Sequence, residues 1–285
     1  LEENYHADTL DLRERLKSSD GTEKFMFKLN DGSFIESVLI YSGERRTICL
    51  STQVGCKYRC AFCASGLRGF VRNLDTSEIL GQILFLEHNL GHKITNFVFM
   101  GMGEPLDNYE NVSRSILIMT EPDGMGIAAK RITISTCGII PGIKALRTLK
   151  KGINLSVSLH AADDSLRSSL MPINKKYPLI ELMKACADFT EKTKGDVTFE
   201  YVLIKGKNDS AEDAEKLARM ANRLNAKINL LVYSPVPQLG LKPPAESDIK
   251  TFIKTLESKK AKITLRRSKG ADIAAACGQL AGRHV

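Results

Sequence analysis

Hydrophobic and polar residues follow a strand-like pattern in the first part of the chain. Apolar residues are dense over residues 25–29 and 33–40, and each run has the length of a single strand. Between them lies Asn30-Asp31-Gly32, a combination typical of tight hairpin turns. A third strand is predicted at residues 47–50. The pattern therefore predicts a small β-hairpin or sheet in this region.

From residue 75 onward, segments with helical spacing of apolar residues alternate with short apolar runs typical of strands. The predicted strands are 96–100, 131–135, 153–159, 197–203, 228–233 and 262–266. The predicted helices are 75–90, 111–120, 139–149, 179–194, 211–224 and 247–256. Such repeated alternation favours right-handed βαβ units around a parallel sheet, and the number of units favours a partial (β/α)6 barrel. In such barrels the chemistry lies at the C-terminal ends of the strands.

These patterns together predict an α/β protein with three regions. Residues 1–46 form an N-terminal extension with the β-hairpin, residues 47–270 form the partial barrel, and residues 271–285 form a C-terminal segment. The chain begins with Leu1 rather than Met, from which we expect that a segment upstream is missing.

Composition excludes several classes of protein. The 285 residues are 43% hydrophobic and 26% charged, which is ordinary for a globular protein and unlike a disordered chain. No apolar run reaches the ~20 residues of a membrane span, and the acidic start at Glu2 and Glu3 is unlike a signal peptide. We therefore expect a cytoplasmic protein without membrane association. The net charge of +8 favours a polyanionic partner such as RNA, although many cytosolic proteins are mildly basic.

Three of the seven cysteines are closely spaced. Cys56, Cys60 and Cys63 form a C-x3-C-x2-C pattern. Three thiolates can hold a 4Fe–4S cluster and leave one iron open to a substrate or cofactor. The alternative is a zinc ion, which normally takes four ligands in a closed site, and none of the five histidines lies nearby in the sequence. The spacing favours the cluster over zinc.

Further motifs accompany this cysteine triplet. They are, in chain order, Ser51-Thr52-Gln53-Val54-Gly55-Cys56, Gly69-Phe70-Val71-Arg72-Asn73-Leu74, Gly101-Met102-Gly103-Glu104-Pro105-Leu106-Asp107-Asn108, Ile134-Ser135-Thr136-Cys137-Gly138 and Asp272-Ile273-Ala274-Ala275-Ala276-Cys277-Gly278-Gln279-Leu280. Together they resemble the RlmN/Cfr family of the radical S-adenosylmethionine (SAM) superfamily, over residues 20–282. The resemblance implies the radical SAM barrel, a 4Fe–4S cluster on the triplet, and SAM as a second cofactor.

The resemblance also implies which residues contact SAM. They follow the predicted strands and are, in chain order, Gly103, Glu104, Ser135, Ser158, Leu159, His160 and Ser234. Glu104 would accept hydrogen bonds from the ammonium group of SAM, and Ser135 would contact its ribose. From the residues alone, a structural role of His160 is favoured. Ser234 stands where the family usually has Asn, and its single hydroxyl cannot bind an adenine edge in a bidentate manner.

The resemblance further implies that two cysteines outside the triplet take part directly in the reaction. Cys277 resembles the residue that is methylated on sulfur, and Cys49 resembles the residue that later attacks this sulfur, releases the product and forms a disulfide. Glu36 matches the family's proton acceptor. From the residues alone, Glu36 is better explained as a solvated carboxylate on a strand.

The resemblance implies a methyltransferase that acts on C2 of adenosine in 23S ribosomal RNA and in transfer RNA, reduced by an electron donor such as flavodoxin. Two alternatives remain open: methylation at C8, as in Cfr, and a non-catalytic RNA-binding protein that holds zinc or a cluster. Residues 1–19 are too few for the helical accessory domain that the family commonly carries. Two basic groups suit an RNA backbone, although such runs are more often solvated surface. They are Arg45, Arg46, Arg68 and Arg72, and Lys259, Lys260, Lys262, Arg266, Arg267 and Lys269.

Overall fold

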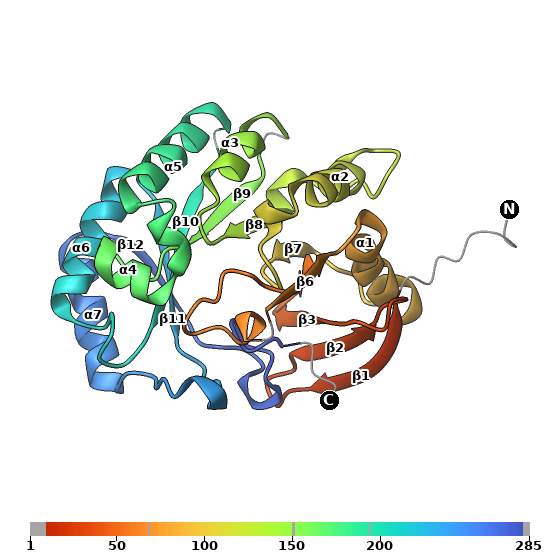
Figure 1. Ribbon diagram of the computed structural model, residues 1–285, viewed down its shortest axis with the longest axis horizontal. Coiled ribbons are helices and arrows are strands. Elements are labelled where there is room, and N and C mark those ends of the chain that lie inside the picture. Colours follow the sequence, from red (N-terminus) through yellow and green to blue (C-terminus); the bar gives the residue numbers. More distant parts are fainter. Residues whose placement is uncertain (1–9, 68, 150–151, 194, 282–285) are drawn as a thin grey trace, which may run out of the picture. The chain divides into compact units, whose positions relative to one another are not determined.

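The computed structural model describes residues 10–67, 69–149, 152–193 and 195–281 (Figure 1). The chain forms two units that interleave along the sequence. Unit 1 comprises Leu1–Lys57, Ala64–Thr133 and Lys269–Val285, and unit 2 comprises Tyr58–Cys63 and Ile134–Ser268. The N-terminal hairpin and the C-terminal segment therefore belong to the same unit.

The N-terminal strands of unit 1 form an antiparallel meander that continues into a parallel pair. Its elements are β1 (Asp11–Lys17), β2 (Glu23–Lys28), β3 (Phe34–Ser42), β4 (Arg45–Cys49), β5 (Gln53–Gly55), β6 (Phe70–Asn73), α1 (Thr76–Leu84), β7 (Asn96–Phe99) and α2 (Tyr109–Thr120). β1 to β4 pair in chain order, and β4 then pairs in parallel with β7. The separate antiparallel pair of β5 and β6 encloses the segment with the cysteine triplet.

Unit 2 contains parallel strands with helices between them. Its elements are α3 (Ile140–Leu149), β9 (Asn154–Ser158), α4 (Asp164–Leu170), α5 (Leu179–Thr193), β10 (Val197–Leu203), α6 (Ala211–Arg223), β11 (Lys227–Val232), α7 (Glu246–Ser258) and β12 (Lys262–Arg266). β8 (Ile132–Thr136) spans the boundary between the units. β9 to β12 pair side by side in chain order. α3 packs against α5, and α6 packs against α7.

The spacing of apolar residues determines which face of a helix is buried, as α6 of unit 2 shows. In α6 the buried positions are Ala214, Leu217, Ala218 and Ala221, which recur at the three- and four-residue intervals of one helix face. Ser210 begins this helix with a capping box. None of the described helices combines the length and the apolar composition that a membrane span requires.

The alternation of strands and helices confirms the predicted α/β class, and β10 and β12 have the predicted bounds. The predicted helix 75–90 is interrupted: α1 ends at Leu84, and Phe85–Asn89 form a π-helical turn. The sequence pattern missed β1, β5, β6 and α4.

Candidate active site

The segment between β5 and β6, which carries Cys56, Cys60 and Cys63, is called the cysteine loop here. Its first half is fixed at its base in unit 1. Cys56 follows β5, and its backbone N–H donates to the Gly69 carbonyl oxygen over 3.0 Å. A Cβ atom on Gly55 would lie 1.9 Å from that same oxygen. Only glycine lets the two ends of the loop approach this closely.

The second half of the loop belongs to unit 2. The Cys63 N–H donates to the Cys60 carbonyl oxygen over 3.1 Å, and the Ala61 N–H donates to the Leu170 carbonyl oxygen, at the end of α4, over 2.8 Å. The buried Phe62 ring packs edge-on against His160, with ring centroids 4.6 Å apart. This half of the loop is therefore anchored beside the end of β9.

All three triplet cysteines are half-buried, so a group bound there would be partly shielded from water. In the described part of the chain, no three His, Cys, Asp or Glu side chains are arranged to hold one metal ion. A zinc ion requires its ligands to converge on one point. A 4Fe–4S cluster does not, because each of its cysteine ligands binds a separate iron. Three partly shielded thiols on one anchored loop fit a cluster.

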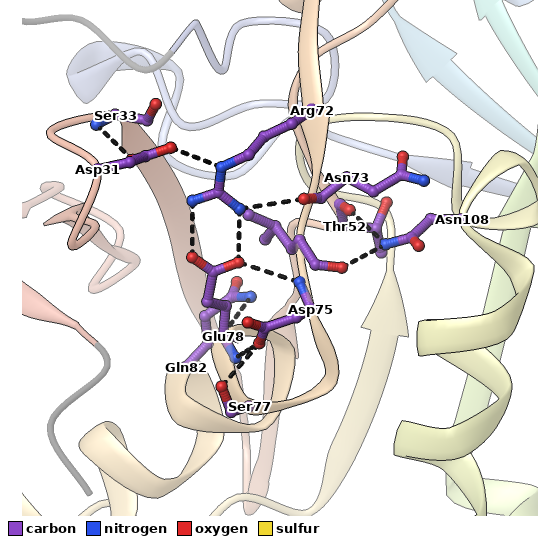
Figure 2. Close-up of polar contacts among 11 residues, drawn as sticks. Asp31, Ser33, Thr52, Arg72, Asn73, Asp75, Ser77, Glu78, Gln82 and Asn108 are labelled. Atoms are coloured by element: carbon purple, nitrogen blue, oxygen red, sulfur yellow. Dashed lines mark hydrogen bonds and ion pairs between the residues drawn. The ribbon is translucent and has the colours of Figure 1, made fainter. Parts of the chain in front are cut away.

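The strand that leaves the loop is held by an ion-pair network around Arg72 (Figure 2). The Arg72 guanidinium donates to Asp31 over 2.6 Å and to both carboxylate oxygens of Glu78 over 2.7 and 2.8 Å. The Glu78 hydrogen bonds raise the pKa of Arg72, and Arg72 lowers the pKa of Asp31 to about 2. Arg72 is therefore engaged within the protein, whereas its position in the sequence suggested an RNA contact. Arg68, of the same basic group, lies outside the described residues.

Gly103 and Glu104 lie in the turn after β7, against Gln53 at the start of β5. A Cβ on Gly103, whose φ is +95°, would lie 2.5 Å from the Cβ of Gln53. The Glu104 N–H donates to the Gln53 side chain over 2.9 Å, and its Oε1 accepts the Leu106 N–H over 3.0 Å. The carboxylate is buried at this strand end. The glycine thus allows close packing against β5, and Glu104 is oriented by Gln53 of that strand and by Leu106 of its own turn.

Unit 1 brings together Cys49, Glu36 and the segment that carries Cys277. Cys49 is buried at the end of β4, and Cys277 is exposed. Burial raises the pKa of the Cys49 thiol, and negative charge on nearby Cys277 raises it further. The Glu36 carboxylate is buried, pairs with Lys24 over 3.0 Å, and accepts the Ala281 N–H over 2.7 Å. The expectation of a solvated strand carboxylate is therefore wrong, because Lys24 and Ala281 occupy its two oxygens.

Further contacts within unit 1 anchor the C-terminal segment on both sides of Cys277. Asp20 accepts the Gly270 N–H over 2.9 Å, and Ser18 donates to Asp272 over 2.5 Å. Beyond Cys277, the Ala64 N–H donates to the Gly278 carbonyl oxygen over 2.7 Å. Cys277 therefore lies at an exposed point of an anchored segment.

The remaining predicted SAM residues lie at strand ends in unit 2. Ser135 is half-buried near the end of β8, Ser158 is half-buried at the end of β9, and Leu159 follows it fully buried. Ser234 is buried just after β11. Their positions agree with the rule that chemistry gathers at the C-terminal ends of barrel strands.

His160 has a structural role in unit 2. Its Nδ1 accepts the Val202 N–H over 3.0 Å, and its backbone lies at φ +54°. Burial, together with the charge of Arg167, lowers the pKa of His160 to about 3. The ring is therefore neutral at physiological pH and carries its proton on Nε2. The hydrogen-bonded structural role favoured from the residues alone is confirmed. The backbone N–H and carbonyl of His160 are also engaged, with Glu200 and Asn208, which leaves Nε2 for a ligand.

Sequence reasoning missed several buried charged residues near these positions, among them Lys24, Glu200 and Arg167. Lys24 pairs with Glu36, as described above. In unit 2, the Glu200 carboxylate on β10 accepts hydrogen bonds from Ser156 over 3.1 Å and Asn229 over 3.0 Å, and burial raises its pKa. A glutamate within the largely apolar strand Val197–Leu203 was the signal that could have identified it.

Comparison with known proteins identifies close relatives. A family model described as the radical SAM superfamily matches residues 50–221. The chain is 43% identical to the "probable dual-specificity RNA methyltransferase RlmN" of Desulforudis audaxviator, over 96% of this chain and 86% of that protein. It is 42% identical to the "dual-specificity RNA methyltransferase RlmN" of Syntrophobacter fumaroxidans, over 100% and 83%. A crystal structure of a radical SAM methyltransferase from Sphaerobacter thermophilus matches with a TM-score of 0.93 and 42% identity, over 96% and 82% of the two chains.

Proposed function

Because the chain belongs to the radical SAM superfamily and, within it, to the RlmN family, we propose that it methylates C2 of an adenosine in 23S ribosomal RNA and in transfer RNA. It is a SAM-dependent radical enzyme with a 4Fe–4S cluster, and its relatives are named as RNA methyltransferases. Such an enzyme needs a one-electron donor, for which a flavodoxin is suited. Since its RNA substrates are cytoplasmic, the enzyme acts in the cytoplasm.

Cys56, Cys60 and Cys63 would hold the cluster, and Glu104 would orient SAM through its ammonium group. When bound, these cofactors supply a carbon-centred radical strong enough to remove a hydrogen atom from a methyl group. The protein keeps the loop closed at its base through the contact between Cys56 and Gly69. It also buries Glu104, so that a hydrogen bond from a cation to this carboxylate is shielded from water.

The arrangement of Cys49 and Cys277 is the observation that carries the proposal. C2 of adenine is electron-poor, so simple transfer of a methyl cation cannot reach it. Cys277 is exposed and would first take the methyl group on its sulfur. After this methyl loses a hydrogen atom, it would bond to C2 and leave the adduct as a radical. The adduct would then lose one electron, for which the oxidised cluster is the acceptor, and one proton from C2. Glu36, anchored to the same segment, is the proposed proton acceptor.

Cys49 would complete the reaction. The Cys49 thiol loses its proton as its sulfur attacks the Cys277 sulfur, and the sulfur–carbon bond breaks with its electrons going to carbon. That carbon takes up a proton to become the methyl group, so no net proton is gained or lost in this step. The two cysteines are left as a disulfide, which must be reduced before the next turnover. Burial and the raised pKa keep Cys49 protonated at neutral pH, which protects it from reacting before the adduct forms.

Analysis of modified nucleosides tests the proposal. The protein, or its Cys277→Ala variant, is expressed in bacterial cells that lack their own adenosine C2 methyltransferase, and 23S ribosomal RNA and transfer RNA are digested for mass spectrometry. We expect 2-methyladenosine with the wild-type protein and none with the variant. The appearance of 8-methyladenosine would instead establish the alternative activity. If neither nucleoside forms while the wild-type protein is abundant and holds its cluster, the proposed function is wrong.

A further inference from the structure

Arg167, on α4, is a fully buried arginine in unit 2. Its exposed fraction is 0%. None of the described carboxylates lies within ion-pair distance of its guanidinium. A buried charge is costly unless it is hydrogen-bonded and compensated. Such a residue therefore needs an explanation beyond packing.

The guanidinium of Arg167 donates to backbone carbonyls at the ends of two strands. Nη2 donates to Cys137 over 2.8 Å and to Ser158 over 3.1 Å, and Nε donates to Leu159 over 3.0 Å. Ser158 and Leu159 are themselves predicted SAM contacts. Cys137 lies two residues after Ser135, the predicted ribose contact. One side chain thus ties together the ends of β8 and β9 from which SAM would be held.

Asn174 fixes the other side of the guanidinium. Its Oδ1 accepts a hydrogen bond from Nη1 of Arg167 over 2.8 Å. Its own Nδ2 donates to the Asp164 side chain over 2.8 Å and to Ser168 over 2.9 Å. Because each of these groups is bonded in turn, the guanidinium has a single orientation.

The positive charge of Arg167 lies near the cysteine loop. The Ala61 N–H donates to the Leu170 carbonyl oxygen, one helical turn after Arg167 on α4. Burial lowers the pKa of Arg167, and negative charge on Cys137 and Cys60 opposes this shift. Cys60 is a predicted cluster ligand. A thiolate of this loop, together with the Asp164 carboxylate, thus supplies negative charge that compensates the buried cation.

We propose that Arg167 is a positioning residue for SAM, which fixes the ends of β8 and β9 through their carbonyls and places a buried positive charge beside the cluster ligand Cys60. This inference rests on the proposed function. A positive charge near the cluster stabilises its reduced form, because reduction adds negative charge. A purely structural arginine would affect folding stability but not the cluster potential.

Four variants of the cluster-loaded protein separate these roles. Arg167→Met removes both charge and hydrogen bonds. Arg167→Lys keeps the charge but cannot bond three carbonyls in a fixed plane. Asn174→Ala loosens the same network while the charge stays. Arg147→Met removes a charge from α3, where Arg147 pairs with Asp188 over 3.8 Å. The measurements are SAM affinity by equilibrium dialysis and the cluster midpoint potential by spectroscopic titration.

For Arg167→Met we expect SAM affinity to fall by about tenfold. We also expect the ratio of reduced to oxidised cluster at a given potential to fall by about tenfold, which for a one-electron couple is a decrease of about 59 mV in midpoint potential. Arg167→Lys should lose SAM affinity but keep its potential. Asn174→Ala should keep its potential too, and Arg147→Met should match the wild type in both measurements.

Several results would overturn the inference. If Arg167→Met has the SAM affinity and the cluster midpoint potential of the wild type, the role of Arg167 is structural only. If Arg167→Met does not fold, Arg167→Lys decides, since unchanged SAM affinity in that variant excludes the positioning role. A wild-type protein that holds a cluster but binds no SAM would instead refute the proposed function and this inference together.

Discussion

The neutral, buried state of His160 makes the stability of the protein depend on pH. Its pKa is about 3 in the folded protein and ordinarily about 6.5. Between these values the unfolded chain binds a proton that the folded protein does not. The free energy of unfolding therefore falls as the pH drops below about 6.5, by about 1.4 kcal/mol per pH unit from this residue.

His160→Asn is the matched control for this prediction. Asparagine tolerates the positive φ of this position and offers Oδ1 as an acceptor for the Val202 N–H, but it does not titrate. Urea unfolding of both proteins at pH 7 and pH 5, at equal cluster content, measures the difference. The wild type should lose more stability than the variant. Equal losses would show that His160 is protonated in the folded protein.

The chemistry of single residues could be predicted only in part. The spacing of Cys56, Cys60 and Cys63 is local, so it is visible in the sequence. The burial of Glu36 is not, because it depends on Ala281, more than two hundred positions away in the chain. Arg167 was missed for a similar reason: its partners are backbone carbonyls at two strand ends, and carbonyls carry no sequence signal.

The turn after β7 packs against the end of β4 so closely that it should tolerate no added atom. A Cβ on Gly101 would lie 2.7 Å from the backbone carbonyl of Leu50. We expect Gly101→Ala to lower the free energy of unfolding by about 1–3 kcal/mol, because backbone must move. Met102→Leu, in the same turn, is the control, since it conserves volume at a buried side chain. Denaturant midpoints of both variants check this, and an unchanged midpoint for Gly101→Ala would show that the strands are free to separate.

Elements with strong apolar periodicity were predictable, and short ones were not. β10 has the predicted bounds because apolar residues dominate it, and β12 has them because polar and apolar residues alternate along it. β5 spans only Gln53–Gly55, and it exists because it pairs with β6 on the far side of the cysteine loop. The seven-residue helix α4 is too short for its periodicity to be read. The bounds of such elements depend on tertiary contacts that the sequence alone does not reveal.

The net positive charge of the chain should contribute to RNA binding through the basic group around β12. Its members are Lys259, Lys260, Lys262, Arg266, Arg267 and Lys269. Lys259 pairs with Glu215 over 3.1 Å, so its charge is less available to bind an RNA phosphate. We expect the combined change Lys260→Ala, Lys262→Ala and Arg267→Ala to weaken RNA binding. The slope of log affinity against log salt concentration should become shallower by about 0.7–0.9 for each RNA phosphate that the variant no longer neutralises.

Filter binding to ribosomal RNA fragments over a range of salt concentrations measures this. Lys216→Ala and Arg219→Ala, on α6, form the control, because both residues pair with glutamates of their own helix. An equal salt slope for the β12 variant and the wild type would mean that this surface does not touch RNA.

The most direct test of the account uses the different roles of Cys49 and Cys277. Cys49→Ala should still accept a methyl group on Cys277 and still bond to RNA, but it cannot release the product. It should therefore accumulate in cells as a covalent protein–RNA adduct, seen on a denaturing gel as a shifted band that nuclease removes. The double variant with Cys277→Ala should show no such band. If Cys49→Ala instead methylates RNA as the wild type does and forms no adduct, the methylcysteine mechanism is wrong for this protein.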